Sequence, residues 1–498
     1  MTYPSSKEFL NLSKKYNLIP VYTQVNADLD TPVSAFLKIS KGDYAFLLES
    51  VEGQEKIARY SFLGSSPSLI FRGKGRDIWI IDPRRKTVRR FLSKVSPLDE
   101  IRKIMQGYRP ATIKGLPRFY GGLVGYIGYE AVRLFEKLPD KNKNDLKLAD
   151  YLFILTDNLL IFDRVNHTIK IVANVFLPES GRTTTVEKER LYIEALRKIE
   201  EIKRDFEKSI SLGKRRDIKP GARIKVNSNF TPAGFKSAVA AVKAYIKKGD
   251  IIQGVLSQRF KVGIGSKDPF DIYRNLRSLN PSPYMFFLKL KELILIGSSP
   301  EMLLRCEDGL LEIRPIAGTR PRGANQKEDR KLEKELLNDA KEKAEHLMLV
   351  DLGRNDLGRV AKTGSLKVRD FMRVEKYSHV MHLVSEVAGV LDKRYDIYDA
   401  LKACFPAGTV TGSPKIRAME IIDELENLKR GPYAGCVGYF SFSQNIDTCI
   451  TIRTIVIKGN SAYLQAGAGI VADSKPQKEY LESVNKAKAL IEAIGKST

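Results

Sequence analysis

The chain has 498 residues, of which 43% are hydrophobic and 29% charged, a composition that excludes a largely disordered protein. This length allows two or three ordinary domains, or one large double-sheet domain with an N-terminal partner. The formal net charge of +25 brings nucleic-acid binding into consideration. However, Lys and Arg are spread along the chain and no RRM, KH, zinc-finger or basic-zipper pattern occurs, so a small dianionic ligand is favoured. A basic nucleic-acid-binding protein, whose binding would depend steeply on salt, is the distant alternative.

Cysteine usage and hydropathy indicate a cytoplasmic protein without membrane contact. The four cysteines (Cys306, Cys404, Cys436 and Cys449) form no CxxC motif and no dense framework, which favours a reducing compartment. The N-terminus lacks the basic and then apolar pattern of a signal peptide. No run of apolar residues is long enough to span a bilayer.

Short strand-like runs rich in β-branched and aromatic residues alternate with turns in the N-terminal part of the chain. These runs are DYAFLLES (43–50), SLIFRG (68–73), DIWIID (77–82), TVRRFL (87–92), LFILTDNLLIF (152–162) and HTIKIVANVF (167–176). A charged helix is predicted over 186–210, and the polar, basic stretch that follows contains Pro and Gly and is the best candidate for a linker.

A second unit begins with a well-marked helix. Thr231 is a suitable N-cap and Pro232 suits the first helical position, while Phe235, Val239, Val242 and Ile246 follow at helical spacing. Strand-like runs then alternate with helices to the end of the chain. We therefore predict an N-terminal unit over 1–211, a linker over 212–229 and a larger unit over 230–498, in an α+β fold with extensive sheet.

Two helices of the larger unit carry paired carboxylates. Glu342 and Glu345 lie in one of them and Glu479 and Glu482 in the other, each pair at i,i+3 spacing and therefore on one helical face. Exposed glutamates on a helix are usually surface residues. If the two faces meet, however, they form an oxygen-rich site suited to Mg²⁺, which takes carboxylates together with groups of an anionic substrate.

A series of ordered motifs decides between these interpretations. In chain order they are GDIIQGVLSQRF (249–260), GSSPEMLLR (297–305), RPIAGTRPRG (314–323), EHLMLVDLGRNDLGRV (345–360), YSHVMHLVSEV (377–387), PAGTVTGSPKIRAMEII (406–422), PYAGCVGYF (432–440), DTCITIRT (447–454) and QAGAGIVADSKPQKEYLESVNKAKAL (465–490). Together they resemble the chorismate-utilising enzymes, specifically the large subunit (component I) of anthranilate synthases. LLES (47–50) and RYSFLG (59–64) extend the resemblance into the N-terminal unit.

The resemblance implies a fold of large antiparallel sheets in a two-layer sandwich, with helices packed outside and an active-site cleft between the sheets. It also implies that ammonia adds to chorismate as the 4-hydroxyl leaves, after which pyruvate is eliminated and the ring becomes anthranilate. Mg²⁺ would be held by Glu345 and Glu482, with Glu342 and Glu479 in support, and would act as a Lewis acid on the ring carboxylate.

The resemblance likewise assigns the substrate contacts. Arg453 and Tyr433 would hold the enolpyruvyl carboxylate with help from Lys486, since arginine carries a rigid, permanent charge. The other positions that the resemblance places around chorismate are Gly467, Gly469, Gln253, Gly318, Thr319, Thr409 and Lys415.

Two residues resemble the groups that move protons. Glu301 resembles the general acid for the departing 4-hydroxyl, a role that needs a carboxyl kept protonated by a desolvated pocket. His382 resembles the catalytic histidine, which would remove the C2 proton during pyruvate loss. The resemblance also places Thr409 among the catalytic residues. His379 has no matched role and is predicted to be structural.

Two positions separate the branches of the family. Water-adding relatives place a lysine base where this chain has Gln253, so ammonia, which is already a nucleophile, has the advantage here. Aminodeoxychorismate synthases read PIKGT with a nucleophilic lysine, whereas this chain has Ala317. Both positions favour anthranilate synthase, and an aminodeoxychorismate-forming relative is the alternative.

The resemblance also implies a tryptophan feedback site and a partner. Glu49 and Ser50, next to Leu48, would meet the polar end of the amino acid. The indole would lie against Pro283, Tyr284, Met285 and Phe286. All four histidines precede Cys436, so the Cys-His order of a glutaminase is absent and ammonia would come from a separate glutaminase subunit, commonly in a heterotetramer.

Overall fold

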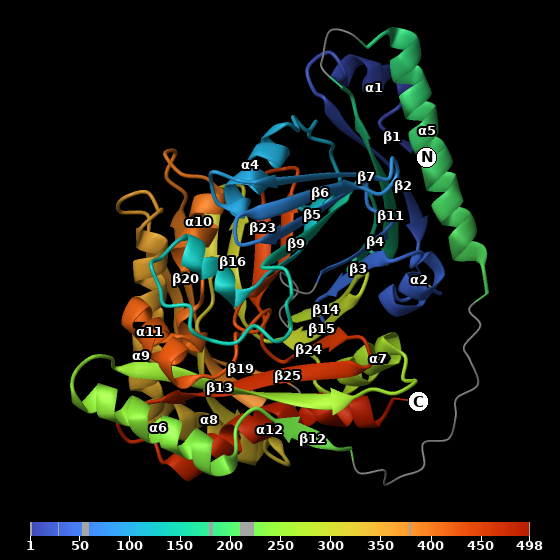
Figure 1. Ribbon diagram of the computed structural model, residues 1–498. Coiled ribbons are helices and arrows are strands. Elements are labelled where there is room, and N and C mark those ends of the chain that lie inside the picture. The colour runs from blue at the N-terminus through green and yellow to red at the C-terminus, as the bar shows by residue number, and fades with distance from the viewer. Residues whose placement is uncertain are drawn as a thin grey trace.

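The computed structural model describes residues 2–27, 29–51, 59–178, 183–209, 224–377 and 380–497, and two large antiparallel sheets dominate it (Figure 1). Among the described residues, the first sheet has 13 strands and the second has 12. The first sheet runs in the order β1 (Thr2–Tyr3), β2 (Leu18–Asn26), β11 (Thr168–Phe176), β10 (Asn158–Asp163), β4 (Tyr60–Ser65), β3 (Tyr44–Glu49), β14 (Tyr284–Leu290), β15 (Leu293–Ser299), β24 (Thr454–Lys458), β25 (Ser461–Ile470), β13 (Gln253–Gly263) and β12 (Val226–Ser228), with β21 (Gly412–Ser413) beside β13.

The second sheet brings together strands from distant parts of the chain. Its order is β18 (Ile316–Pro321), β20 (Val380–Val390), β17 (Leu310–Ile313), β16 (Met302–Glu307), β23 (Ile446–Ile450), β22 (Cys436–Ser441), β8 (Gly122–Ile127), β9 (Tyr151–Thr156), β5 (Leu69–Lys74), β6 (Asp77–Asp82) and β7 (Thr87–Leu92), with β19 (Lys367–Lys376) beside β20. Every strand-like run predicted from the sequence forms a strand, and Asp157 divides the run 152–162 into β9 and β10.

The N-terminal and C-terminal units contribute strands to the same sheets. In the first sheet β3 pairs with β14, and in the second β8 pairs with β22. The predicted boundary therefore divides the chain along its sequence, whereas each sheet contains strands from both units. Residues 212–223 of the predicted linker lie outside the described residues, and β12 in its last part pairs with β13.

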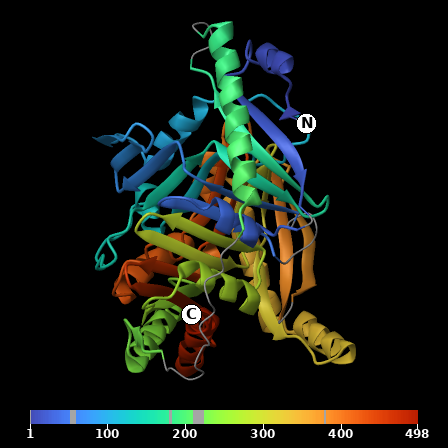
Figure 2. The same ribbon diagram turned by 90° about the vertical axis from the view of Figure 1, so that its right-hand side faces the viewer.

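Helices cover the outer faces of the sandwich, as the first two figures show from perpendicular directions (Figures 1 and 2). They are α1 (Ser6–Leu12), α2 (Pro32–Ile39), α4 (Pro97–Gln106), α5 (Thr185–Glu207), α6 (Pro232–Lys247), α7 (Pro269–Leu279), α8 (Gln326–Asn338), α9 (Ala340–Gly358), α10 (Ile397–Cys404), α11 (Lys415–Leu425) and α12 (Pro476–Gly495), with short 3₁₀ turns η1 (Tyr129–Leu134) and η2 (Gly408–Val410). α6 has the predicted Thr231 cap and Pro232 start. No helix within the described ranges is both long and apolar enough to cross a membrane.

The two largest of four apolar clusters among the described residues hold these layers together. One lies between the sheets and joins side chains of the first sheet, such as Phe286, to side chains of the second, such as Phe153 and Tyr439. The other lies outside the first sheet, where Leu47 and Ile171 pack with residues of α5, α7 and α12. The sequence prediction of an α+β fold with a two-layer sandwich and outer helices is confirmed.

Candidate active site

Two adjacent chain crossings between the sheets position Glu301 and Arg453. The chain passes from β15 in the first sheet to β16 in the second at Ser299–Glu301, and returns from β23 to β24 at residues 451–453. The Ile450 amide donates to the Glu301 carbonyl at 3.0 Å, and the Ser298 amide donates to the Arg453 carbonyl at 3.1 Å. Hydrogen bonds between the crossings therefore hold the two predicted site residues in fixed relation.

Arg453 combines an unusual backbone with an unused charge. Its φ of 49° lies in the left-handed region, which is unfavourable for a residue with a side chain and which is concentrated at functional sites. Burial lowers the pKa of Arg453, while Tyr433 and Glu482 act in the opposite direction. The described residues offer its guanidinium no ion pair. The group is therefore available to bind an anion.

Glu301 is buried, and burial raises the pKa of its carboxyl group to about 8, although Thr409 and Lys486 lower it in part. Thr409 lies in the η2 turn, and its buried hydroxyl has no well-formed hydrogen bond within the described part of the chain. A carboxyl group with this pKa is mostly protonated at neutral pH. It can therefore donate a proton to a leaving group beside it.

His382 has a defined tautomer. It lies opposite Thr319 in the β18–β20 pairing, and its Nδ1 is 2.9 Å from the Gly318 carbonyl oxygen and 3.1 Å from the Thr319 hydroxyl. Because a carbonyl oxygen only accepts, Nδ1 carries the hydrogen and Nε2 has a free lone pair. Burial lowers the pKa of His382. The hydrogen bond to Gly318 opposes this shift, and the nearby charge of Arg453 adds to it. The ring is thus neutral near pH 7 and can accept a proton at Nε2.

The predicted carboxylate pairs face one another from α9 and α12. Burial raises the pKa of Glu345, and the neighbouring Glu342 and Glu482 raise it further. Gln253 donates to Glu345 through Nε2 at 3.4 Å, while Glu482 pairs with Lys486 at 2.7 Å. A buried carboxylate surrounded by other carboxylates favours a cation beside it.

The two supporting glutamates have partners of their own. Glu342 pairs with Arg320 at 3.2 Å, and burial raises the pKa of Glu479, which Ser474 lowers and Glu482 raises. Among the described residues no three metal-binding side chains lie close enough to hold an ion by themselves. Mg²⁺ is often held by only one or two carboxylates, with water and substrate completing its coordination, and Glu345 and Glu482 could serve it in this way.

The predicted glycines keep space for side chains of the site. A Cβ at Gly467 of β25 would lie 2.4 Å from the Leu256 carbonyl oxygen and 3.0 Å from the Tyr433 hydroxyl. A Cβ at Gly469 would lie 2.7 Å from Gln253 Nε2. Lys486 donates to the Gly467 carbonyl at 3.1 Å. Glycine at both positions thus lets Tyr433 and Gln253 reach the strand.

Lys415 differs from the other predicted site residues because its charge is already used. Its ammonium group lies 2.8 Å from both carboxylate oxygens of Asp356 and 3.5 Å from the Cys404 carbonyl oxygen. The structure joins the other predicted residues in one network, and a substrate contact by Lys415 stays a prediction. Sequence reasoning missed Asp356, although it lies in the motif 345–360, and missed Arg320. His379 lies outside the described residues.

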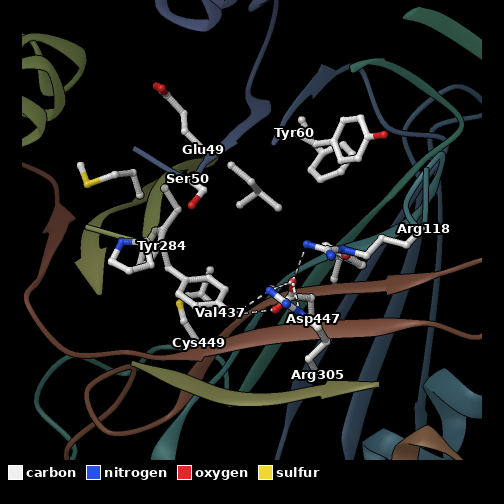
Figure 3. Close-up of a pocket in the computed structure, with 16 residues that line it drawn as sticks. Glu49, Ser50, Tyr60, Arg118, Tyr284, Arg305, Val437, Asp447 and Cys449 are labelled. Atoms are coloured by element: carbon white, nitrogen blue, oxygen red, sulfur yellow. Dashed lines mark hydrogen bonds and ion pairs between the residues drawn. The ribbon is translucent and has the colours of Figure 1, made fainter. Parts of the chain in front are cut away.

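Apart from this site, a pocket between the sheets is lined by all seven residues of the predicted tryptophan site (Figure 3). They are Leu48, Glu49, Ser50, Pro283, Tyr284, Met285 and Phe286. The second sheet supplies further lining residues that sequence reasoning missed, among them Arg305 and Asp447. Asp447 binds Arg305 at 3.1 Å, Arg118 at 3.2 Å and the Tyr284 hydroxyl at 2.9 Å.

Two polar residues of this pocket differ in availability. The Glu49 carboxylate is 3.1 Å from Arg277 and 3.1 Å from the Tyr273 hydroxyl, and its side chain is directed away from the centre of the pocket (Figure 3). By contrast, the Ser50 hydroxyl is buried without a hydrogen bond within the described ranges. A ligand would therefore meet Ser50 directly, whereas the Glu49 side chain is committed to other residues.

Comparison with known proteins places this site in a family. The family model for chorismate binding enzymes matches residues 43–492, so the chain belongs to the chorismate binding enzyme family. It is 49% identical to anthranilate synthase component 1 of Aquifex aeolicus, over 98% of this chain and 97% of that protein. It is 47% identical to the protein of the same name from Acetivibrio thermocellus, over 99% of each.

Solved structures agree with this placement. The crystal structure of anthranilate synthase component I from Streptococcus pneumoniae matches with a TM-score of 0.75 and 35% identity, over 94% of this chain and 98% of that one. The menaquinone-specific isochorismate synthase from Escherichia coli has the same fold, with a TM-score of 0.70 at 19% identity over 98% of this chain and 99% of that one.

Proposed function

We propose that the chain is the large subunit of an anthranilate synthase, a lyase that converts chorismate and ammonia to anthranilate and pyruvate in the first committed step of tryptophan biosynthesis. The observation that carries the proposal is that adjacent chain crossings hold the buried Glu301 carboxyl group and Arg453, whose guanidinium has no ion pair among the described residues. Burial raises the pKa of Glu301 and lowers that of His382, which supports an acid and a base at this site. Gln253 and Ala317 support amination and aromatisation over the water-adding and aminodeoxychorismate-forming branches.

In this mechanism the substrate carboxylate binds Arg453, next to Tyr433 and Lys486. Ammonia forms a bond to C2 as the C4–oxygen bond breaks, and Glu301 gives its proton to the departing hydroxyl, which leaves as water. The new ammonium group at C2 loses a proton to solvent and becomes the amine. Nε2 of His382 then removes the C2 proton. The electron pair of that bond enters the ring as the enolpyruvyl group leaves and takes up a proton to become pyruvate.

Magnesium is the proposed cofactor. Glu345 and Glu482 would hold the ion, with Glu342 and Glu479 in support, and when bound it supplies Lewis-acid stabilisation of the ring carboxylate. The pKa of Glu345, which its neighbouring carboxylates raise, supports this assignment. Lys486 lies between Glu482 and the Gly467 carbonyl group, with which it forms an ion pair and a hydrogen bond.

Ammonia would come from a glutaminase partner subunit. The relatives are named as component 1, and the order of cysteine and histidine in this chain does not provide a glutaminase. A heterotetramer of two large and two small subunits is the proposed assembly. The described cysteines are all free and buried, which suits the reducing cytoplasm.

The pocket between the sheets would bind tryptophan as a feedback inhibitor. Met285 and Phe286 offer apolar surface for the indole, and the unbonded Ser50 hydroxyl faces the polar end. Inhibition requires that tryptophan favour a conformation that binds chorismate less well, and chorismate then weakens tryptophan binding by the same factor.

The test is anthranilate fluorescence from purified chain, chorismate, Mg²⁺ and ammonium near pH 8.5, with and without tryptophan. Fluorescence that needs Mg²⁺ and falls with tryptophan is expected. Chorismate consumed without fluorescence would favour the aminodeoxychorismate alternative, and no consumption by folded protein would refute the proposed function.

A further inference from the structure

Arg430 is the largest fully buried side chain among the described residues, and it lies between three segments that carry predicted substrate contacts. It belongs to the loop between α11 and β22, and neither the family motifs nor the mechanism above gives it a role. Its side chain is only 1% exposed. A charge buried this completely needs partners on every side, and those partners show what it holds together.

Glu426 fixes the guanidinium in place. Arg430 donates to the two carboxylate oxygens through Nε at 2.9 Å and Nη2 at 2.6 Å. Glu426, with its side chain 2% exposed, also accepts from the amide and hydroxyl groups of Ser257 in β13, at 2.9 and 2.8 Å. The pair is thus oriented by bidentate geometry and anchored to a strand.

The remaining donors reach two segments of the substrate site. Nη1 donates to the Val410 carbonyl at 2.7 Å, directly after Thr409. Nη2 donates to the Val255 carbonyl at 2.8 Å, two residues after Gln253 and opposite Gly469 in the β13–β25 pairing. One side chain therefore ties the turn of Thr409 to the strand of Gln253.

The guanidinium of Arg430 lies over the rings of two tyrosines. Its carbon lies 4.9 Å from the centre of the Tyr129 ring and 5.5 Å from that of Tyr433. A cation over an aromatic face is attracted to the ring and restrains its orientation. Tyr433 is the predicted substrate contact whose hydroxyl approaches the backbone at Gly467. The arginine thus supports a third segment of the site.

We propose that Arg430, oriented by Glu426, is a positioning residue for chorismate binding that holds Thr409, Gln253 and Tyr433 at their working distances. The inference rests on the proposed function. Lysine cannot replace Arg430, because an ammonium group is not planar and cannot donate to a carboxylate and two carbonyl groups in the fixed geometry of a guanidinium.

The competing explanation is a buried ion pair that only stabilises the fold. Arg133 provides a control, because it binds the buried Asp423 at 2.5 Å and the Pro139 carbonyl at 2.9 Å and, within the described part of the chain, forms no hydrogen bond or ion pair with the three segments. If stability alone mattered, losing either arginine would change the same properties of the enzyme.

The experiment measures KM for chorismate, kcat with saturating ammonium and Mg²⁺, and the thermal midpoint for wild type, Arg430→Lys and Arg133→Lys. We expect Arg430→Lys to raise KM at least tenfold, with a thermal shift similar to that of Arg133→Lys, whose KM should stay within twofold of wild type. A KM within twofold of wild type for Arg430→Lys, or an equal rise in both variants, would overturn the proposal.

Two further variants keep the test decisive if Arg430→Lys fails to fold. Glu426→Gln removes the orienting charge, and Tyr129→Leu removes one face of the stack; each should raise KM, by about threefold or more, and unchanged values in both would overturn the inference. Tyr433→Phe should raise KM by itself but less than additively with Arg430→Lys. A wild type that forms no anthranilate would instead refute the proposed function, and the inference with it.

Discussion

The buried carboxyl group of Glu301 predicts a variant that is more stable and less active than wild type. Glu301→Gln keeps the size of the side chain but removes the charge that burial disfavours. Folding raises the pKa of this group from 4.5 to about 8, so between these values the folded chain binds more protons than the unfolded chain. Stability therefore falls as pH rises through this window, and the penalty is complete above it.

The size of the effect follows from the shift. At about 1.4 kcal/mol per pKa unit, a rise from 4.5 to about 8 costs the wild type about 4 kcal/mol at pH 9 relative to pH 5, because part of the penalty is already present at pH 5. Glutamine has no proton to lose, so the variant should be close to wild type near pH 5 and exceed it at pH 9. Its kcat should fall by about 10²–10⁴, because the amide cannot protonate the leaving hydroxyl.

The assay is thermal unfolding of both proteins in EDTA at half-unit steps from pH 5 to pH 9, paired with anthranilate formation in Mg²⁺. Glu492→Gln, which removes an exposed carboxylate paired with Lys496, is the control and should show no gain at high pH. If the difference in unfolding midpoint between Glu301→Gln and wild type stays constant across this range, the reasoning about burial is refuted.

Three further changes test other parts of the site. Ser50→Phe and Met285→Thr should keep uninhibited turnover but relieve tryptophan inhibition, and equal inhibition in wild type and both variants would contradict the assignment of the pocket. Arg453→Lys should raise KM for chorismate by about 10- to 100-fold, since a hydrogen bond to a charged group contributes about 1.5–3 kcal/mol; an unchanged KM in steady-state kinetics would argue against the clamp. Gly469→Ala should raise KM several-fold with little loss of thermal stability, because its Cβ would lie 2.7 Å from the movable end of Gln253, and a wild-type KM would show that Gln253 does not contact the substrate.

Local patterns in the sequence were sufficient for much of the fold. The Thr231 cap and the following Pro232 start α6 as predicted, because capping and the fixed φ of proline act within one turn. The pairing of β3 with β14 could not be predicted by such means. Nothing near Leu47 in the sequence indicates that Phe287 will be its partner, since long-range pairing depends on the whole sandwich.

The site shows the same division. The motifs indicated the positions of Glu301, His382 and Arg453, and the structure joins them to the predicted glutamates. The ion pair of Lys415 with Asp356 was not predicted, because which charges meet depends on how α11 and α9 pack. For the same reason, the contacts of Arg277 and Tyr273 with the Glu49 carboxylate could not be predicted.

The two crossings between the sheets have a consequence for how distant sites respond to each other. Glu301 and Arg453 each sit where the backbone leaves one layer for the other, and the pocket behind them has Met285 on the first layer and Asp447 on the second. The geometry of both sites therefore depends on how the two layers are placed relative to each other. If a molecule in the pocket shifted one layer against the other, the spacing between Glu301 and Arg453 would change with it. Such a shift would couple the two sites through the sheets themselves, and no chain of side chains between the sites would be needed.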